Sequence, residues 1–301
     1  KSLTTFFNCN FTLCETPYDK GGALFIQDQL NSPNNERLTL DGCIFDNCNS
    51  SAGAAIYASL SSSPEIKRCT IKNNVQGCSI FILTFTSKIP QLKIDNCTFQ
   101  NNEYLNTEEK PDCGGSGIWI SNVYQVEFSN CYFINNKADY VGGALAYGHD
   151  KELAEISIIF DSCFFEENKC NGKYGGALYL VNSQTKITDC TFRGNKPLGS
   201  NEIKGGDIYV DATSGGVTIS DSHFESSTNQ INEGNAIYCS SNTDKLSISN
   251  TNFNDCGISG TVITSYAKDN TITSTNVEFS EAANEKSARG LALYLIPESI
   301  T

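Results

Sequence analysis

Residues 163–181 read Cys-Phe-Phe-Glu-Glu-Asn-Lys-Cys-Asn-Gly-Lys-Tyr-Gly-Gly-Ala-Leu-Tyr-Leu-Val. They contain two markers: a Cys-x-Phe step that begins at Cys163, and a Gly-led step, Gly-Gly-Ala-Leu-Tyr, that begins at Gly175. The two markers alternate along the whole chain of 301 residues, with a period of about 30 residues. A fixed period of this size indicates a stack of repeated structural units.

Both markers occur in nine or ten copies, some of them degenerate. The Gly-led steps begin at Gly21, Gly53, Gly77, Gly115, Gly142, Gly175, Gly205, Gly234, Ser259 and Gly290. The Cys-x-Phe steps begin at Cys9, Cys43, Cys69, Cys97, Cys131, Cys163 and Cys190, with Ser222 and Thr251 in the same place in later copies. Because the two signals alternate without a linker between them, we expect one continuous domain over residues 1–301.

The pattern inside each repeat is that of β-strands. Apolar and polar residues alternate in Leu92-Lys93-Ile94 and in Leu246-Ser247-Ile248, which places one face inward and one outward. Each repeat holds three such strands, three bends and a polar loop, and equivalent strands of successive repeats can only pair in parallel. The sequence therefore predicts an all-β fold, a right-handed parallel β-helix of about ten coils, which forms a rod about 45–50 Å long.

The net charge of −13 argues against binding to nucleic acid or to an anionic membrane surface, which require basic residues. No apolar stretch approaches the ~20 residues of a membrane span, so we expect no direct membrane insertion by this segment. The chain has no Met and starts at Lys1, which favours a mature or excised segment of a longer secreted or cell-surface protein. Its ends carry no obvious cap, which favours a longer chain or ends covered by partners, and self-association through the terminal coils stays open.

The cysteines before the buried phenylalanines are expected to form an interior column of small apolar side chains. Their spacings of 26–34 residues differ from the clustered spacing of a zinc site, so neither a metal nor a cofactor is predicted.

Three residues after each phenylalanine lies a second column, in which asparagine dominates. We expect an inward amide stack from Asn74, Asn102, Asn136, Asn168 and Asn195. Cys14 and Cys48 occupy this column in adjacent coils and are candidates for a disulfide, as are Cys78 and Cys113 near the Gly-led step. Disulfides fit an extracellular protein, but adjacent strands often have unsuitable geometry, so both pairings stay open.

A third column lies on the Gly-led strand, between aliphatic residues that should point inward. Alternation then directs this column outward, as a stripe of aromatic residues interrupted at Ala146 and Ile263. The stripe consists of Phe25, Tyr57, Phe81, Trp119, Tyr179, Tyr209, Tyr238 and Tyr294. One interpretation is self-stacking along the sheet; the other is a contact surface for sugar rings or for another chain.

Parallel β-helices include polysaccharide lyases and hydrolases, so an enzyme must be considered. Glycoside hydrolysis needs two carboxylates within about 5–10 Å of each other, and the paired acids here lie on polar loops. The two histidines, His149 and His223, form no recognisable catalytic set, and His223 should point outward from its strand. We therefore predict no catalytic residues and a non-enzymatic protein.

The repeats resemble those of the polymorphic membrane protein family of chlamydiae. The resemblance lies in Gly-Gly-Ala-Leu at 21–24, 142–145 and 175–178, and in Phe-x-x-Asn at 99–102, 133–136, 165–168 and 192–195, and weaker copies extend it over the whole chain. It implies a secreted passenger displayed at the cell surface for adhesion. Related repeats occur in protist surface proteins, and the sequons at Asn10, Asn49 and Asn96 would be usable in a eukaryotic secretory pathway.

The sequence thus predicts an adhesin-like extracellular rod whose partner is a cell-surface protein or glycan. Two alternatives remain: a subunit of an extracellular filament or coat that assembles end to end, and a polysaccharide-active β-helix enzyme.

Overall fold

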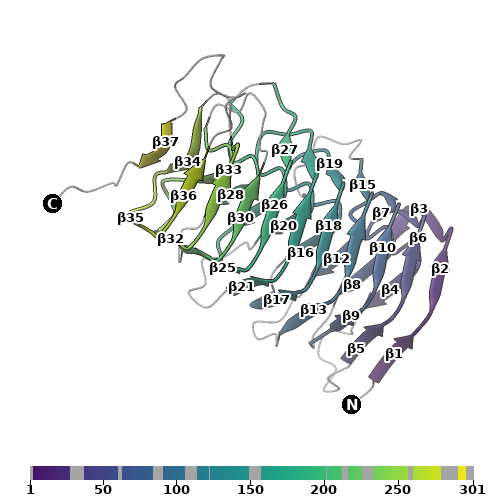
Figure 1. Cartoon of the computed structure of the whole chain (residues 1–301). Helices are drawn as coiled ribbons and strands as arrows, with labels where there is room; N and C mark the ends of the chain where they lie inside the picture. Colours follow the sequence, from purple (N-terminus) through teal and green to yellow (C-terminus); the bar gives the residue numbers. More distant parts are fainter. Residues whose placement is uncertain are drawn as a thin grey trace.

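The computed structural model describes residues 3–27, 37–59, 63–83, 91–105, 114–121, 123–148, 157–200, 202–211, 216–225, 233–256, 260–278 and 291–295. All regular secondary structure in these ranges is β-strand, and every strand pair is parallel. The strands form four sheets that coil around one axis, with the N-terminal coil at one end of the rod and β37 at the other (Figure 1). The predicted parallel β-helix is confirmed.

Sheet A holds the strands that precede the Cys-x-Phe step, and it runs through ten coils. Its strands are β1 (Leu3–Phe7), β5 (Arg37–Asp41), β9 (Glu65–Lys67), β13 (Leu92–Asp95), β17 (Gln125–Ser129), β21 (Ser157–Asp161), β25 (Gln184–Thr188), β29 (Gly216–Ser220), β32 (Lys245–Ser249) and β35 (Asp269–Thr273).

Sheet B holds the Cys-x-Phe strands, each three residues long, in the same ten coils. They are β2 (Asn10–Thr12), β6 (Ile44–Asp46), β10 (Thr70–Lys72), β14 (Thr98–Gln100), β18 (Tyr132–Ile134), β22 (Phe164–Glu166), β26 (Thr191–Arg193), β30 (His223–Glu225), β33 (Asn252–Asn254) and β36 (Asn276–Glu278).

Sheet D holds the Gly-led strands, whose central residues carry the aromatic stripe. They are β4 (Leu24–Gln27), β8 (Ile56–Ser59), β12 (Ile80–Leu83), β16 (Ile118–Ser121), β20 (Leu145–Gly148), β24 (Leu178–Val181), β28 (Ile208–Asp211), β31 (Ile237–Cys239), β34 (Thr261–Ser265) and β37 (Leu291–Leu295).

Sheet C is a fourth, short sheet where the sequence predicted a loop. Most of its strands have two residues, which is too short for alternation to be visible in a polar stretch. Its strands are β3 (Glu15–Lys20), β7 (Asn49–Ala52), β11 (Val75–Gln76), β15 (Glu103–Tyr104), β19 (Lys137–Ala138), β23 (Lys169–Cys170) and β27 (Lys196–Pro197).

The corners between sheets are turned by single residues with positive φ. Asn96 (φ 52) turns from sheet A to sheet B, and Asn101 (φ 53) turns from sheet B to sheet C. In most coils the first glycine of the Gly-led step turns into sheet D, as Gly175 does at φ 63, whereas in the third coil the residue with positive φ is Gln76, just before Gly77. A Cβ on Gly175 would collide with the carbonyl oxygen of Leu178, so the step needs glycine for space as well as for conformation.

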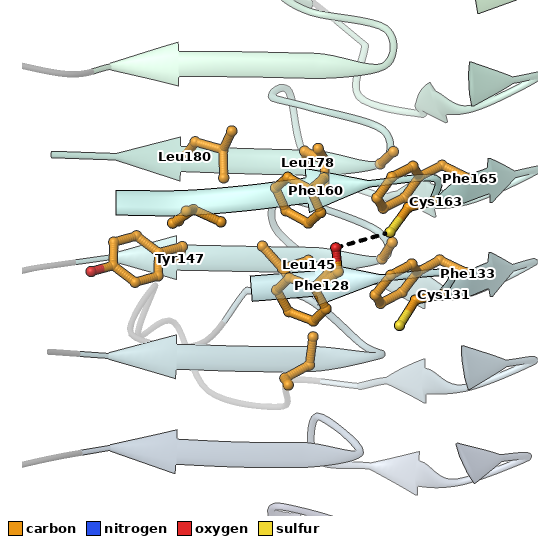
Figure 2. Close-up of a cluster of buried hydrophobic side chains, with 14 of the residues drawn as sticks. Phe128, Cys131, Phe133, Leu145, Tyr147, Phe160, Cys163, Phe165, Leu178 and Leu180 are labelled. Atoms are coloured by element: carbon orange, nitrogen blue, oxygen red, sulfur yellow. Dashed lines mark hydrogen bonds between the residues drawn. The ribbon is translucent and has the colours of Figure 1, made fainter. Parts of the chain in front are cut away.

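The interior is a set of side-chain columns. The phenylalanines of sheet B stack with centroids 4.9 Å apart between Phe133 and Phe165 and 4.7 Å apart between Phe165 and Phe192, and all three are fully buried. Figure 2 shows this column beside Phe128 and Phe160 of sheet A. Burying each such ring stabilises the fold by about 1.5–3 kcal/mol, so the repeated Cys-x-Phe step adds one such contribution in nearly every coil.

The cysteine column lies in the interior, as predicted. Cys163 donates a weak hydrogen bond to the carbonyl oxygen of Phe128 in the preceding coil, at 3.6 Å (Figure 2), and Cys131 makes the equivalent bond to Ile94 at 3.4 Å. The thiols therefore act as small packed donors between coils.

The asparagine column forms the predicted ladder. Asn136 donates through Nδ2 to Asn168 Oδ1 at 2.9 Å and to the carbonyl oxygen of Phe99 at 2.9 Å. Its own Oδ1 accepts from Nδ2 of Asn102 at 2.9 Å. The same bonds repeat from Asn74 to Asn195, so the buried amides satisfy both one another and the corner backbone.

One alignment of the repeat was wrong by a residue. The strand register pairs Tyr238 with Thr264, and Thr264 with Tyr294, so Thr264 rather than Ile263 occupies the aromatic column. Ile263 is fully buried and pairs with Ile237. The turn glycine of that coil is Gly260 (φ 96), and the expected Ser259 lies outside the described residues.

Candidate binding surface

The aromatic stripe lies on the outer side of sheet D, as alternation predicted. Leu178 and Leu180 are fully buried in the interior, whereas Tyr179 between them is only partly buried. Tyr57 and Phe81 form a cluster with Cys78 that is separate from the main core. The stripe therefore packs on the outside of the β-helix wall.

The stripe is divided into two stacks. In the first, ring centroids lie 5.3 Å apart between Phe25 and Tyr57 and 4.8 Å apart between Tyr57 and Phe81, with nearly parallel planes, and Trp119 follows at 4.2 Å from Phe81 with a tilt of 60°.

The second stack contains Tyr179, Tyr209 and Tyr238, with centroid separations of 5.3 and 5.4 Å and planes within 9° of parallel. The stacks are separated by Ala146, which is 2% exposed. In that coil Tyr147 turns inward instead and donates its hydroxyl hydrogen to the carbonyl oxygen of Val123 at 2.6 Å.

Most of the stripe is covered. Tyr57, Phe81 and Tyr238 are only 6%, 7% and 5% exposed, whereas Phe25 and Tyr294, in the first and last described coils, are 52% and 40% exposed. The exposed rings thus lie at the two ends of the stripe, and Trp119, Tyr179 and Tyr209 between them are half-buried.

Lysines that precede the Gly-led step provide part of the cover. Lys20 lies 4.7 Å from the centroid of the Tyr57 ring and donates to its hydroxyl at 3.3 Å. Lys204 makes the same two contacts with Tyr238: its Nζ lies 4.7 Å from the ring centroid and donates to the hydroxyl at 3.1 Å. Each lysine reaches forward to the ring of the next coil, a contact that the sequence of a single repeat does not reveal.

The rings stack along the rod, so their faces are occupied by one another and their edges point outward. A sugar ring prefers to pack on an aromatic face, and these faces are free only at the ends of a stack. Burial, with the nearby carboxylate of Asp211, also raises the pKa of Tyr179 and Tyr209. Both effects favour the neutral form of these two stacked tyrosines.

Two tyrosines of the stack were missed by the repeat pattern. Tyr174 lies with its ring centroid 4.7 Å from that of Tyr209, and Tyr266 lies 5.8 Å from Tyr238. Neither is in the aromatic column, since Tyr174 immediately precedes Gly175 and Tyr266 follows strand β34. Their only sequence signal is closeness to a Gly-led strand.

The candidate cysteines remain without a disulfide in this structure. Cys14 is half-buried and Cys48 is buried, and both thiols are unbridged. Burial raises the pKa of Cys48 to about 12. Cys78 is buried beside Tyr57 and Phe81, and Cys113 lies outside the described residues. Both pairings stay predictions.

The three sequons differ in accessibility. Asn10 and Asn96 are exposed, and Asn96 lies at a corner with positive φ, as expected from its position at a bend. Asn49 is half-buried, and its Nδ2 donates to Glu15 Oε1 at 3.3 Å. Asn10 and Asn96 are therefore the better placed glycan acceptors.

The potential metal ligands and the two histidines have the following places. Over the ranges that the structure describes, no three His, Cys, Asp or Glu side chains gather as a metal site. His223 is half-buried on the outer side of β30, near Glu225, and His149 lies outside these ranges. Within the same ranges, no helix has the length and apolar character to cross a bilayer.

Comparison with known proteins identifies the fold family. A family model described as "Right handed beta helix region" matches residues 2–110 and 92–226, so this chain belongs to the right-handed β-helix family. Metabotropic glutamate receptor-like protein R of Dictyostelium discoideum is 24% identical over 180 residues, which cover 54% of this chain and 11% of that protein. The chain thus matches only about a tenth of that relative's length. No solved structure matches.

Proposed function

We propose that this chain is a non-enzymatic, adhesin-like part of an extracellular surface protein, and that it binds a cell-surface protein or glycan through the outer faces of its sheets. The observation that carries the proposal is the rod itself. Ten strands in register along sheets A, B and D repeat each outer position from coil to coil, so a rigid surface is presented over the whole length.

The relatives support an extracellular setting. The β-helix family membership fits a surface protein, and the Dictyostelium discoideum relative is named as receptor-like. The repeats that resemble polymorphic membrane proteins favour the same role. The two exposed sequons, Asn10 and Asn96, would suit a eukaryotic secretory route, and the resemblance leaves open a bacterial or a protist surface protein.

The proposal is tested by the location of the native protein on intact cells and by the binding of the purified chain to them. Antibody labelling without permeabilisation should detect the native protein on the surface, and the purified chain should bind to cells saturably and in competition with unlabelled chain. Labelling that requires permeabilisation, or binding that never saturates, would overturn the proposal. For a eukaryotic source, enzymatic removal of N-glycans should lower the mass of the native protein.

Two alternative functions can be distinguished from the adhesin-like function by simple measurements. An end-to-end filament or coat subunit would associate through the terminal strands of each sheet. Sedimentation at increasing concentration would then show growing species, whereas the adhesin proposal expects a monomer. A polysaccharide-active enzyme would release products from acidic polysaccharides, and such turnover would overturn the non-enzymatic proposal.

A further inference from the structure

A second aromatic site lies on the outer face of sheet B, in the middle of the rod. Tyr132 of β18 and Phe164 of β22 are register neighbours, and their ring centroids are 6.2 Å apart. Tyr132 is 48% exposed, more than any ring in the interior of the sheet D stacks. The repeat pattern does not single out this column, because it holds phenylalanine or tyrosine in only two adjacent coils.

The geometry of this pair differs from that of the sheet D stripe. The planes of Tyr132 and Phe164 are inclined by 53°, so the two rings do not cover one another's faces. Among the described residues, the Tyr132 hydroxyl has no hydrogen-bond partner. Tyr132 therefore offers both an accessible apolar ring and an unused polar group.

A fixed polar group lies next to the rings. Arg193 of β26 donates from Nε to Glu225 at 2.9 Å, and its Nη1 lies 3.5 Å from Glu166. Its guanidinium carbon lies 5.7 Å from the centroid of Phe164. Two carboxylates thus hold the guanidinium in place while it remains 46% exposed, and its other N–H groups are available to a ligand.

These groups lie on strands inside a ten-stranded sheet, whose backbone is already paired on both sides. A partner cannot add a strand here, so it must contact side chains. The apolar part is limited to the two rings, which is far smaller than the ~800 Å² that each partner buries in a typical protein–protein interface. The site therefore suits a ligand of a few rings.

The charge selects among such ligands. Glu166, Arg193 and Glu225 sum to −1, and the chain carries −13, so an acidic glycan or a nucleic acid would be repelled. A neutral pyranose has an apolar C–H face, which packs on an aromatic ring, and hydroxyl groups, which bond to carboxylate and guanidinium groups.

We infer that the outer face of sheet B over β18, β22 and β26 binds a neutral glycan, with a sugar ring on Tyr132 and hydroxyl groups bonded to Arg193 and Glu166. This inference rests on the proposed adhesin-like function and gives it a ligand class and a place. Phe164 supports the site by packing between the Tyr132 ring and the guanidinium.

The test uses titration calorimetry of the purified chain with neutral hexasaccharides of glucose, mannose and N-acetylglucosamine, and with an acidic oligogalacturonate. At least one neutral sugar should bind. Tyr132→Ala should weaken this binding by about tenfold or more, whereas Tyr132→Phe, which keeps the ring, should lose much less. Tyr18→Ala is the matched control, because Tyr18 is 98% exposed and lies in the first coil.

Circular dichroism and urea unfolding of each variant would show that the fold is intact. Failure of every neutral sugar to bind, preference for the acidic sugar, or equal affinity in Tyr132→Ala would each overturn the inference. Saturable cell binding that persists unchanged in Tyr132→Ala would overturn it while leaving the adhesin-like function standing. Absence of any saturable cell binding would count against that function instead.

Discussion

Asn195 ends the interior asparagine ladder by donating from Nδ2 to Oδ1 of Asp207, at 2.9 Å. Asp207 is fully buried and occupies the place that Ala144 and Ala177 take in earlier Gly-led steps. Along the ladder, each Nδ2 donates to the Oδ1 of the asparagine in the next coil, from Asn74 towards Asn195. The carboxyl group of Asp207 therefore accepts the side-chain donor at the end of the ladder.

The ladder should contribute strongly to stability. Asn136→Ala removes the acceptor of the Asn102 backbone N–H and of one Nδ2 hydrogen of Asn102, and it leaves these two buried donors unsatisfied. Each unsatisfied group costs about 1–3 kcal/mol, so we expect the free energy of unfolding to fall by about 2–6 kcal/mol in urea titrations. Asn252→Ala, at an exposed position of β33, is the control and should change it by less than about 0.5 kcal/mol. A similar loss in both variants would contradict the role of the ladder.

The turn glycines can be tested against a glycine without constraints. Gly175 has φ 63 and no room for a Cβ, so Gly175→Ala should destabilise the chain by more than about 1 kcal/mol. Gly148, at the end of β20, has open space where a Cβ would stand, with no heavy atom within 4 Å, and Gly148→Ala should be neutral or slightly stabilising. Thermal unfolding of the two variants gives the comparison, and equal midpoints would refute the steric argument.

The covered part of the aromatic stripe should contribute to the stability of the fold and not to binding. Tyr238→Ala removes a ring that is 5% exposed, stacked on Tyr209 and covered by Lys204, so we expect a loss of about 3–5 kcal/mol in the free energy of unfolding. Tyr18→Ala, at a side chain that is 98% exposed, should cost little. If Tyr238→Ala kept full stability but lost binding to cells, the stripe would be a contact surface instead.

The buried thiols should resist alkylation. Burial raises the pKa of Cys170 and of Cys239 to about 12, and the thiolate is the reactive form. At pH 8 the native chain should leave both unmodified by iodoacetamide, while the denatured chain reacts fully, as peptide mass spectrometry would show. Fast modification of either residue in the native chain would contradict their burial.

The same thiols give stability a pH dependence with a definite sign. In the unfolded chain a thiol ionises near its ordinary pKa of about 8.5, whereas these two keep their protons up to about pH 12 in the fold. The unfolded state therefore binds fewer protons between these values, and the free energy of unfolding should fall as pH rises through this window. Replacing both cysteines by Ala should flatten that part of the profile.

By itself, the sequence determined the parallel β-helix, the inward cysteine and asparagine columns and the outward direction of the stripe. These features follow from the alternation of apolar and polar residues within a strand and from the repeated period. Both can be read directly from the sequence. The tertiary structure decided what covers the outer residues, because the cover comes from another coil about 30 residues away, as Lys204 does for Tyr238.

The same reason explains the other differences. The short strands of sheet C exist only because neighbouring coils supply pairing partners, and the place of Thr264 is fixed by its register with Tyr238. The inclined arrangement of Tyr132 and Phe164, with Arg193 beside Phe164, is likewise visible only in the tertiary structure. Periodicity assigns each residue to a face of the sheet, but only contacts between coils decide which side chains on the outer face remain open to a ligand.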